Sequence, residues 1–189
     1  MTILSDREII KLCKNHQMIT PFFDKNIAFE RGSKVLSYGL SSYGYDARLG
    51  DQFKIFNPKS NKAVDPKNFS DCLYEDINTS EPVTIPPNGF ILAKTLERFI
   101  IPRDVLSVCL GKSTYARCGL VVNVTPLEPE WQGHVTLEIS NTSSLPAIVY
   151  PYEGVCQFLF FRASKMCRES YADKNGKYQN QEGVCVPRM

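Results

Sequence analysis

The sequence predicts a mainly β protein, a sandwich or distorted barrel of short strands. Three observations support this fold class: short apolar runs recur along the chain, turn residues such as Pro86-Pro87-Asn88-Gly89 separate them, and helix signals are few. A chain of 189 residues fits one domain, and neither an internal repeat nor a change of composition divides it. We therefore expect a single domain over residues 1–189.

The individual elements follow from local patterns. Ser5 and Glu8 form a capping box, which predicts a short helix that continues through Cys13. Strands are expected at residues 35–49, 53–55, 83–85, 90–92, 99–101, 105–110, 120–124, 135–140, 147–150 and 155–161. Residues 57–80 are polar and rich in turn residues, which predicts a long surface excursion. Residues 171–189 are polar and contain glycine, which predicts a tail.

Charge and hydropathy exclude several classes of partner. The 22 Lys and Arg nearly balance the 20 Asp and Glu, and a net charge of +2 provides no protein-wide field for nucleic acid or an acidic membrane. Apolar runs stay well short of the roughly 18 residues of a membrane span. The first residues become polar too early for a signal peptide, and an odd number of cysteines fits a reducing compartment. We expect a cytoplasmic protein without nucleic-acid or membrane partners.

Potential metal ligands are few in this sequence. Seven Cys and two His are present, but no Cys-x-x-Cys pair occurs, and His16 and His134 lie far apart. Neither a zinc finger nor a His-Glu-x-x-His site can be written on this pattern. We expect most of the cysteines to be small buried apolar groups.

Residues 111–119 contain the first candidate binding segment. Gly111-Lys112-Ser113-Thr114 resembles the end of a phosphate-binding P-loop, but that motif requires glycine where this chain has Leu106. What remains is a strand that leads into a short helix with hydroxyls and a lysine at its start. Such a helix start is either an anion-binding site or simply a capped surface helix, and the pattern alone favours the second.

The strand expected at residues 135–140 alternates cleanly in polarity. Its apolar residues face one side, and His134, Thr136, Glu138 and Ser140 face the other. The polar face is either solvated, or it lines a cavity in which Glu138 acts as a general acid and base. Periodicity does not choose between these alternatives. A lone histidine such as His134 is more often an ordinary hydrogen-bonding residue than a ligand.

The tail interleaves Tyr, Lys and Gln with Gly between residues 171 and 183. Rings can stack on a base, ammonium groups can bind phosphate and amides can contact base edges, so the tail can close over a nucleotide. The alternative is a disordered polar terminus. The density of aromatic and amide groups favours the nucleotide interpretation.

Four segments taken together resemble the dCTP deaminase family of the trimeric dUTPase-like superfamily. They are Ser41-Ser42-Tyr43-Gly44-Tyr45-Asp46, Gly111 to Gly119, Trp131 to Asn141 and Gly176 to Gly183. The resemblance implies a distorted β-barrel or jelly-roll with a short N-terminal helix, assembled as a homotrimer with active sites between subunits. It further implies a hydrolase acting on the C–N bond of a cyclic amidine, which converts dCTP to dUTP and ammonia and so feeds dUMP and dTTP synthesis.

The resemblance also implies roles for particular residues. Glu138 would be the catalytic acid and base, with Ser113 and Arg117 beside it. The substrate would be contacted by Lys112, Ser113, Thr114, Tyr115, Ala116, Arg117, Thr136, Leu137, Glu138, Gln157, Tyr171, Lys177, Tyr178 and Gln181. Mg²⁺ would arrive bound to the triphosphate rather than to protein ligands, and dTTP would be an inhibitor. The tail, residues 171–189, would close over the nucleotide.

A zinc-free deamination agrees with the small number of potential metal ligands in the sequence. Most nucleobase deaminases use a zinc-bound hydroxide held by His and Cys, and this sequence lacks their signature. A zinc-free route would use Glu138 to take a proton from water, with donors such as Ser113 and Arg117 stabilising the developing charge. Two departures from the family pattern stand out: Lys112 replaces an Arg found in some members, and the segment 125–131 lacks an Arg that some members carry.

Two alternative functions remain at this point. A bifunctional enzyme would also hydrolyse dUTP to dUMP and pyrophosphate. A nucleotide-sensing β-barrel would bind the same ligand without turnover.

Overall fold

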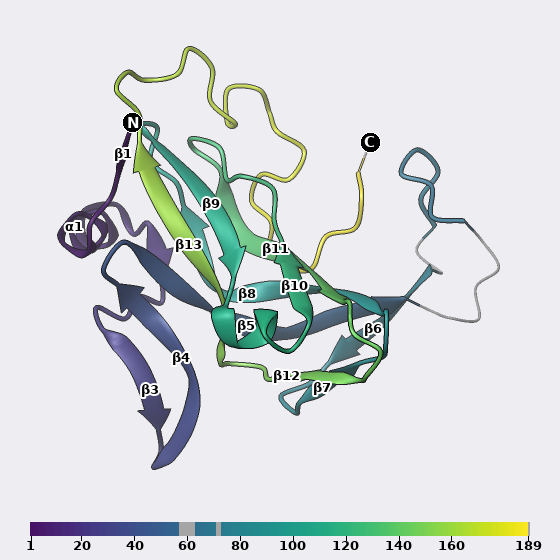
Figure 1. Cartoon of the computed structure of the whole chain (residues 1–189). Helices are drawn as coiled ribbons and strands as arrows, with labels where there is room; N and C mark the ends of the chain where they lie inside the picture. Colours follow the sequence, from purple (N-terminus) through teal and green to yellow (C-terminus); the bar gives the residue numbers. More distant parts are fainter. Residues whose placement is uncertain (57–62, 71–72, 189) are drawn as a thin grey trace.

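The fold is built on one large, curled antiparallel sheet (Figure 1). The computed structural model describes residues 1–56, 63–70 and 73–188. Within these residues eleven strands join the sheet, with the central order β1–β13–β5–β8–β11–β10. These six strands span Thr2–Ile3, Gly154–Arg162, Gly44–Phe56, Phe90–Ile100, Gln132–Asn141 and Leu120–Asn123. The predicted mainly β class is confirmed.

The remaining strands attach to this central path. Strand β2 (Ile19–Thr20) pairs with β8, and β9 (Val105–Gly111) pairs with β13. Strand β3 (Asn26–Glu30) pairs with β4 (Ser33–Ser41), which in turn pairs with β5. Strand β6 (Tyr74–Asn78) also pairs with β5. A separate two-stranded sheet joins β7 (Val83–Ile85) to β12 (Ala147–Val149). The hairpin of β3 and β4 projects away from the barrel (Figure 1).

Strand β5 curls the sheet because it belongs to two pairings along its 13 residues. Its first half pairs with β4 and β13, where Asp46 lies opposite Gly39 and Gln157. Its second half pairs with β8 and β6, and the register shifts between Leu49 and Phe53. Bulges and shifts of this kind bend a strand and increase its twist. The result is a half-barrel whose two sides share β5.

Aromatic side chains join the two sides in the core. Phe99 of β8 and Phe158 of β13 are both fully buried, and their ring centroids lie 4.6 Å apart. Burial alternates along β11, where Val135, Leu137 and Ile139 face the core. Alternation with period 2 is what a strand with one buried face requires. The predicted division of residues 135–140 into an apolar and a polar face is confirmed.

The predicted helices are present. Helix α1 (Asp6–His16) begins after Ser5, whose backbone N–H donates to Glu8 Oε2 at 3.2 Å, as a capping box requires. It continues one turn beyond Cys13 and ends where Gln17 adopts a left-handed conformation, with φ at 51°. The second helix, α2 (Ser113–Ala116), is a single turn at the segment expected to be helical.

Some elements differ from the prediction. The strands predicted at 90–92 and 99–101 are joined in one continuous strand, β8, which ends at Ile100, because the charged residues between them are accommodated inside the sheet. Glu97 is fully buried and accepts hydrogen bonds from the Arg48 backbone N–H and Nε, both at 2.8 Å. A charge paired in this way can lie in an interior strand. Strands β1, β2 and β3 were not predicted, since two of them have only two residues.

The segment 57–80 is only partly a surface excursion. Residues 74–78 form β6 and extend the sheet beside β5, which was not predicted. The part of the predicted excursion at 57–62 and 71–72 lies outside the described residues. The expected strand at 35–49 is a hairpin of β4 and β5, which turns at Ser42 and Tyr43.

The C-terminal tail packs against β11. The Asn180 N–H donates to Gln132 O at 2.9 Å, and the His134 N–H donates to Gln181 O at 2.7 Å. Gly133 permits this approach, because its φ is 143° and a Cβ there would lie 2.7 Å from the Gln181 backbone. These contacts give the tail a defined path along β11.

Candidate active site

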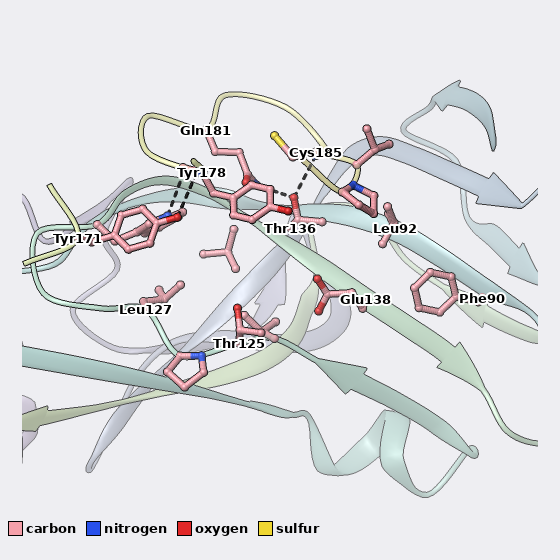
Figure 2. A pocket seen from close by; sticks show the side chains of 16 residues that line it. Phe90, Leu92, Thr125, Leu127, Thr136, Glu138, Tyr171, Tyr178, Gln181 and Cys185 are labelled. Atoms are coloured by element: carbon pink, nitrogen blue, oxygen red, sulfur yellow. Dashed lines mark hydrogen bonds between the residues drawn. The ribbon is translucent and has the colours of Figure 1, made fainter. Parts of the chain in front are cut away.

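Thr136 and Glu138 lie on the polar face of β11, and that face lines a cavity. The cavity has a volume of about 320 Å³. Its walls come from β8, β11, the segment that follows β10 and the tail (Figure 2). The lining residues are Phe90, Leu92, Val124, Thr125, Pro126, Leu127, Trp131, Val135, Thr136, Glu138, Tyr171, Tyr178, Gln181, Cys185, Val186 and Pro187. The polar face was predicted either to be solvated or to line a cavity, and at Glu138 the face lines a cavity.

The carboxylate of Glu138 is the unusual group in this cavity. Glu138 Oε2 is buried, and it has no hydrogen-bond partner anywhere in the described residues. Burial penalises the charged form, and this desolvation raises the pKa of Glu138 to about 7, although a hydrogen bond from its own backbone opposes the shift. A carboxyl group with a pKa near neutrality can both take and return a proton.

Apolar side chains cause this desolvation. Leu92 lies directly opposite Glu138 in the register of β8 and β11. Phe90, from the same strand, lines the cavity near Glu138, and Trp131 belongs to the same lining (Figure 2). Around a single carboxylate such walls act as a low-dielectric environment. These apolar residues were not identified from the sequence as part of a site, because apolar residues in a strand are also typical of a hydrophobic core.

The tail forms the opposite wall and engages Thr136. Thr136 Oγ1 accepts from Gln181 Nε2 at 2.5 Å and from the Cys185 N–H at 3.1 Å (Figure 2). Gln181 Nε2 also donates to His134 O at 2.8 Å. Both lone pairs of this hydroxyl are then used, so its own proton is available to a ligand. The Tyr178 backbone N–H donates to the Tyr171 hydroxyl at 3.0 Å, which links the Tyr171 ring to the backbone of the tail. Thr136, Glu138, Tyr171, Tyr178 and Gln181 were all predicted, and the structure gathers them in one cavity.

A second group of predicted residues lies elsewhere in the chain. Lys112 Nζ is 2.6 Å from Asp46 Oδ2, and Gln157 Nε2 donates to Asp46 Oδ1 at 3.1 Å. Arg117 is exposed, and its Nη1 donates to Ser113 O at 2.9 Å. None of these residues lines the cavity. Within one chain the predicted site is therefore divided into two groups: the cavity around Glu138 and the α2 cluster, defined as Lys112, Ser113, Arg117 and Gln157.

Four further predicted residues have individual positions. Thr114 and Ala116 are exposed on α2. Tyr115 is buried, and its hydroxyl accepts the Tyr150 N–H at 3.1 Å, so its ring belongs to the core. Leu137 is fully buried on the core face, which leaves only its backbone to contact a ligand. Lys177 Nζ donates to Arg188 O at 2.7 Å within the tail.

The ring of His134 makes an ordinary hydrogen bond. Its Nδ1 lies 3.1 Å from Thr95 O, and burial lowers the pKa of His134. No group of three or more His, Cys, Asp or Glu side chains in residues 1–56, 63–70 and 73–188 could hold a metal ion. Within the same ranges, every helix is too short or too polar to cross a membrane.

Comparison with known proteins identifies the family. The family model described as dCTP deaminase-like matches residues 3–163. The chain belongs to the dCTP deaminase-like family. A dCTP deaminase of Pseudomonas putida (strain GB-1) is 55% identical over 188 residues and is covered completely, as is this chain. A dCTP deaminase of Pseudomonas fluorescens (strain SBW25) gives the same identity and coverage.

Solved structures support the fold of this dCTP deaminase-like protein. The crystal structure of 2′-deoxycytidine 5′-triphosphate deaminase from Agrobacterium tumefaciens aligns with a TM-score of 0.59 and 17% identity. The alignment covers 84% of this chain and 47% of that one. At this identity the likeness concerns the fold alone, and it confirms the distorted β-barrel expected from the resemblance to the dCTP deaminase family.

Proposed function

We propose that this protein is a hydrolase that deaminates dCTP to dUTP and ammonia. Its family membership and the names of relatives that are 55% identical over the full chain support this substrate. The observation that carries the proposal is Glu138, whose Oε2 is buried in a cavity without a hydrogen-bond partner in the described residues. An acceptor that costs free energy to bury is expected to find its partner in a ligand or an attacking water.

The proposed reaction adds one water to the amine-bearing carbon of cytosine. Glu138 takes a proton from the water as its oxygen bonds to this carbon, and passes the proton to the ring nitrogen beside it. A second proton moves from the new hydroxyl through Glu138 to the amino group. The carbon–nitrogen bond then breaks, a carbonyl forms, and ammonia leaves. Glu138 is a carboxylate again, and one water has been consumed for each ammonia released.

We propose that cationic stabilisation of the developing charge comes from groups outside the cavity of one chain. Ser113 and Arg117 are the proposed donors for the water and the developing charge. They belong to the α2 cluster and do not line the cavity around Glu138. We therefore propose a homotrimer in which the α2 cluster of one subunit completes the cavity of the next. Exposed apolar side chains at Leu110 and Val121, which flank α2 in the sequence, support a covered surface there.

The triphosphate is the proposed ligand of the positive side chains. We propose that Lys112 and Lys177 bind phosphate oxygens. Mg²⁺ would enter as part of the nucleotide complex, held by those oxygens and neutralising their charge. We further propose that the reaction proceeds without zinc, that dTTP inhibits by occupying the same site, and that the enzyme works in the cytoplasm. The product would supply dUMP and dTTP synthesis.

Product analysis tests this function. Incubation with dCTP and Mg²⁺ is expected to release dUTP and ammonia in equal amounts, measured by anion-exchange chromatography and an ammonia assay. Accumulation of dUMP and pyrophosphate would instead identify the bifunctional alternative, and binding without any ammonia would identify a sensor. As a control, a zinc-selective chelator with Mg²⁺ in excess should leave the rate unchanged, and loss of activity would contradict the zinc-free route.

The rate should depend on pH through Glu138. Its pKa of about 7 lies above the ordinary value because burial disfavours the carboxylate. Since the carboxylate is the form that takes the proton from water, kcat/KM should fall about tenfold from pH 8 to pH 6. The nucleotide itself titrates in this range. The affinity of the Glu138→Gln variant for dCTP is therefore measured at each pH, and the kcat/KM profile is corrected by it. A corrected profile that stays flat down to pH 5.5 would contradict the assignment.

A further inference from the structure

We infer that Asp46 is a positioning residue of the nucleotide site, which it serves through Lys112 and Gln157. This inference rests on the proposed function and adds a residue to it. Asp46 lies in β5, is only 7% exposed and does not line the cavity around Glu138. It is therefore placed to act on the side chains beside it rather than on the reacting base.

Each oxygen of the Asp46 carboxylate has its own partner. Lys112 Nζ lies 2.6 Å from Oδ2, and Gln157 Nε2 donates to Oδ1 at 3.1 Å. The strand register produces this arrangement. Asp46 and Gln157 are direct partners in the pairing of β5 with β13, and paired residues of antiparallel strands share one face. Lys112 follows β9, which pairs with the other edge of β13.

The carboxylate also fixes which way the Gln157 amide points. A carboxylate only accepts hydrogen bonds, so the amide nitrogen must face Asp46 and the amide oxygen must point away. The same nitrogen donates to Ser41 Oγ at 3.2 Å, which uses the second N–H. Gln157 Oε1 is then the one group of this side chain left for a ligand, and it can only accept.

The Lys112 ammonium is fixed in the same way. It has three N–H donors, of which Asp46 takes one, and no other acceptor for it is found among the described residues. Two donors therefore remain beside the acceptor Oε1 of Gln157. A phosphate oxygen matches the donors and a neighbouring hydroxyl matches the acceptor, and a deoxynucleoside triphosphate carries both.

Stability alone is a weak reason for this buried pair. The side chains of Lys112 and Asp46 are only 11% and 10% exposed. Apolar residues of similar volume often replace a buried ion pair without loss of stability. Gly44 adds a packing constraint, because a Cβ there would lie 2.7 Å from Phe158 O and 3.4 Å from Gln157 Cγ. The absence of a side chain at Gly44 thus lets β5 lie close to β13, so that the Asp46 carboxylate reaches the Gln157 amide.

Equilibrium binding tests the inference without turnover. In the Glu138→Gln background, Asp46→Asn should weaken the binding of Mg²⁺–dCTP about tenfold or more, measured by isothermal titration calorimetry. The asparagine amide donates as well as accepts, so it no longer fixes Gln157, and it leaves Lys112 without its counter-charge. The matched control is Asp51→Asn on the same strand, where the carboxylate accepts from the Tyr152 hydroxyl at 3.2 Å. That variant should bind as its parent does.

Two further measurements separate positioning from general structure. In the Glu138 enzyme, Asp46→Asn should raise KM for dCTP by a larger factor than it lowers kcat. Once Lys112→Met and Gln157→Leu are both present, Asp46→Asn should change affinity less than twofold, because both side chains through which it acts are gone. A full tenfold effect in that background would overturn the inference, as would an unchanged affinity of the single variant.

The outcome is decided even if Asp46→Asn does not fold. Gln157→Leu leaves the ion pair of Asp46 with Lys112 intact, and its melting temperature shows whether it folds. If Gln157→Leu binds Mg²⁺–dCTP as tightly as its parent, Asp46 cannot act through this amide, and the inference is wrong. Wild-type protein that binds dCTP but releases no ammonia would refute the proposed function alone. Protein that does not bind dCTP would refute both.

Discussion

Glu138→Gln is expected to abolish ammonia release from dCTP. Glutamine keeps the shape of the side chain but cannot take a proton from water, and a positioned general base contributes a factor of about 10² to 10⁴. The loss should appear in kcat, measured by ammonia release at saturating Mg²⁺–dCTP. Nucleotide binding should persist, because the cavity walls are unchanged. Full activity of the variant would refute the role assigned to Glu138.

The same substitution should not damage the fold. Burial raises the pKa of Glu138 from 4.5 to about 7, so the folded state holds its proton more tightly than the unfolded chain does. Stability therefore falls as pH rises between these two values, and at pH 8 the folded protein carries the full cost of a buried charge. Glu138→Gln removes that cost, so its melting temperature at pH 8 should equal or exceed that of the wild type. The matched control, exposed Glu81→Gln, should leave activity unchanged.

Mixing two inactive variants should restore activity. If Arg117 of one subunit completes the cavity around Glu138 of the next, Arg117→Ala and Glu138→Gln place their defects in different halves of each site. In every trimer that contains both variants, one of the three sites combines an intact Arg117 with an intact Glu138, so about a third of the wild-type rate should return. The measurement is dCTP deamination by trimers that are co-expressed with two tags and purified through both.

A second mixture provides the control for this experiment. Ser113→Ala and Arg117→Ala lie in the same α2 cluster, so each subunit contributes a defective cluster and no mixed trimer contains an intact site. This mixture should remain as inactive as its less active parent. If the first mixture also stays inactive although the mixed trimers form, the residues of one site come from a single subunit and the proposed arrangement is wrong.

Local patterns in the sequence were sufficient for much of the fold. The capping box of Ser5 and Glu8 marked the start of α1, and the alternation at residues 135–140 defined the two faces of β11. Where an element was missed, tertiary pairing was the cause. Strand β8 was predicted in two pieces because only its ends are continuous apolar runs. The buried Glu97 between them is satisfied by Arg48, 49 residues away in the chain.

The candidate site shows the same division. The sequence alone placed Glu138 on the polar face of a strand and provided, through four spaced motifs, the family to which the chain belongs. Only the tertiary structure showed that this face is covered by Leu92, Trp131 and the tail, which leaves Glu138 Oε2 buried and without a partner in the described residues. It also connected Asp46 to Lys112 and Gln157. The physical reason is that periodicity reports the direction of a side chain, whereas its burial, pKa and partners depend on segments that are distant in sequence.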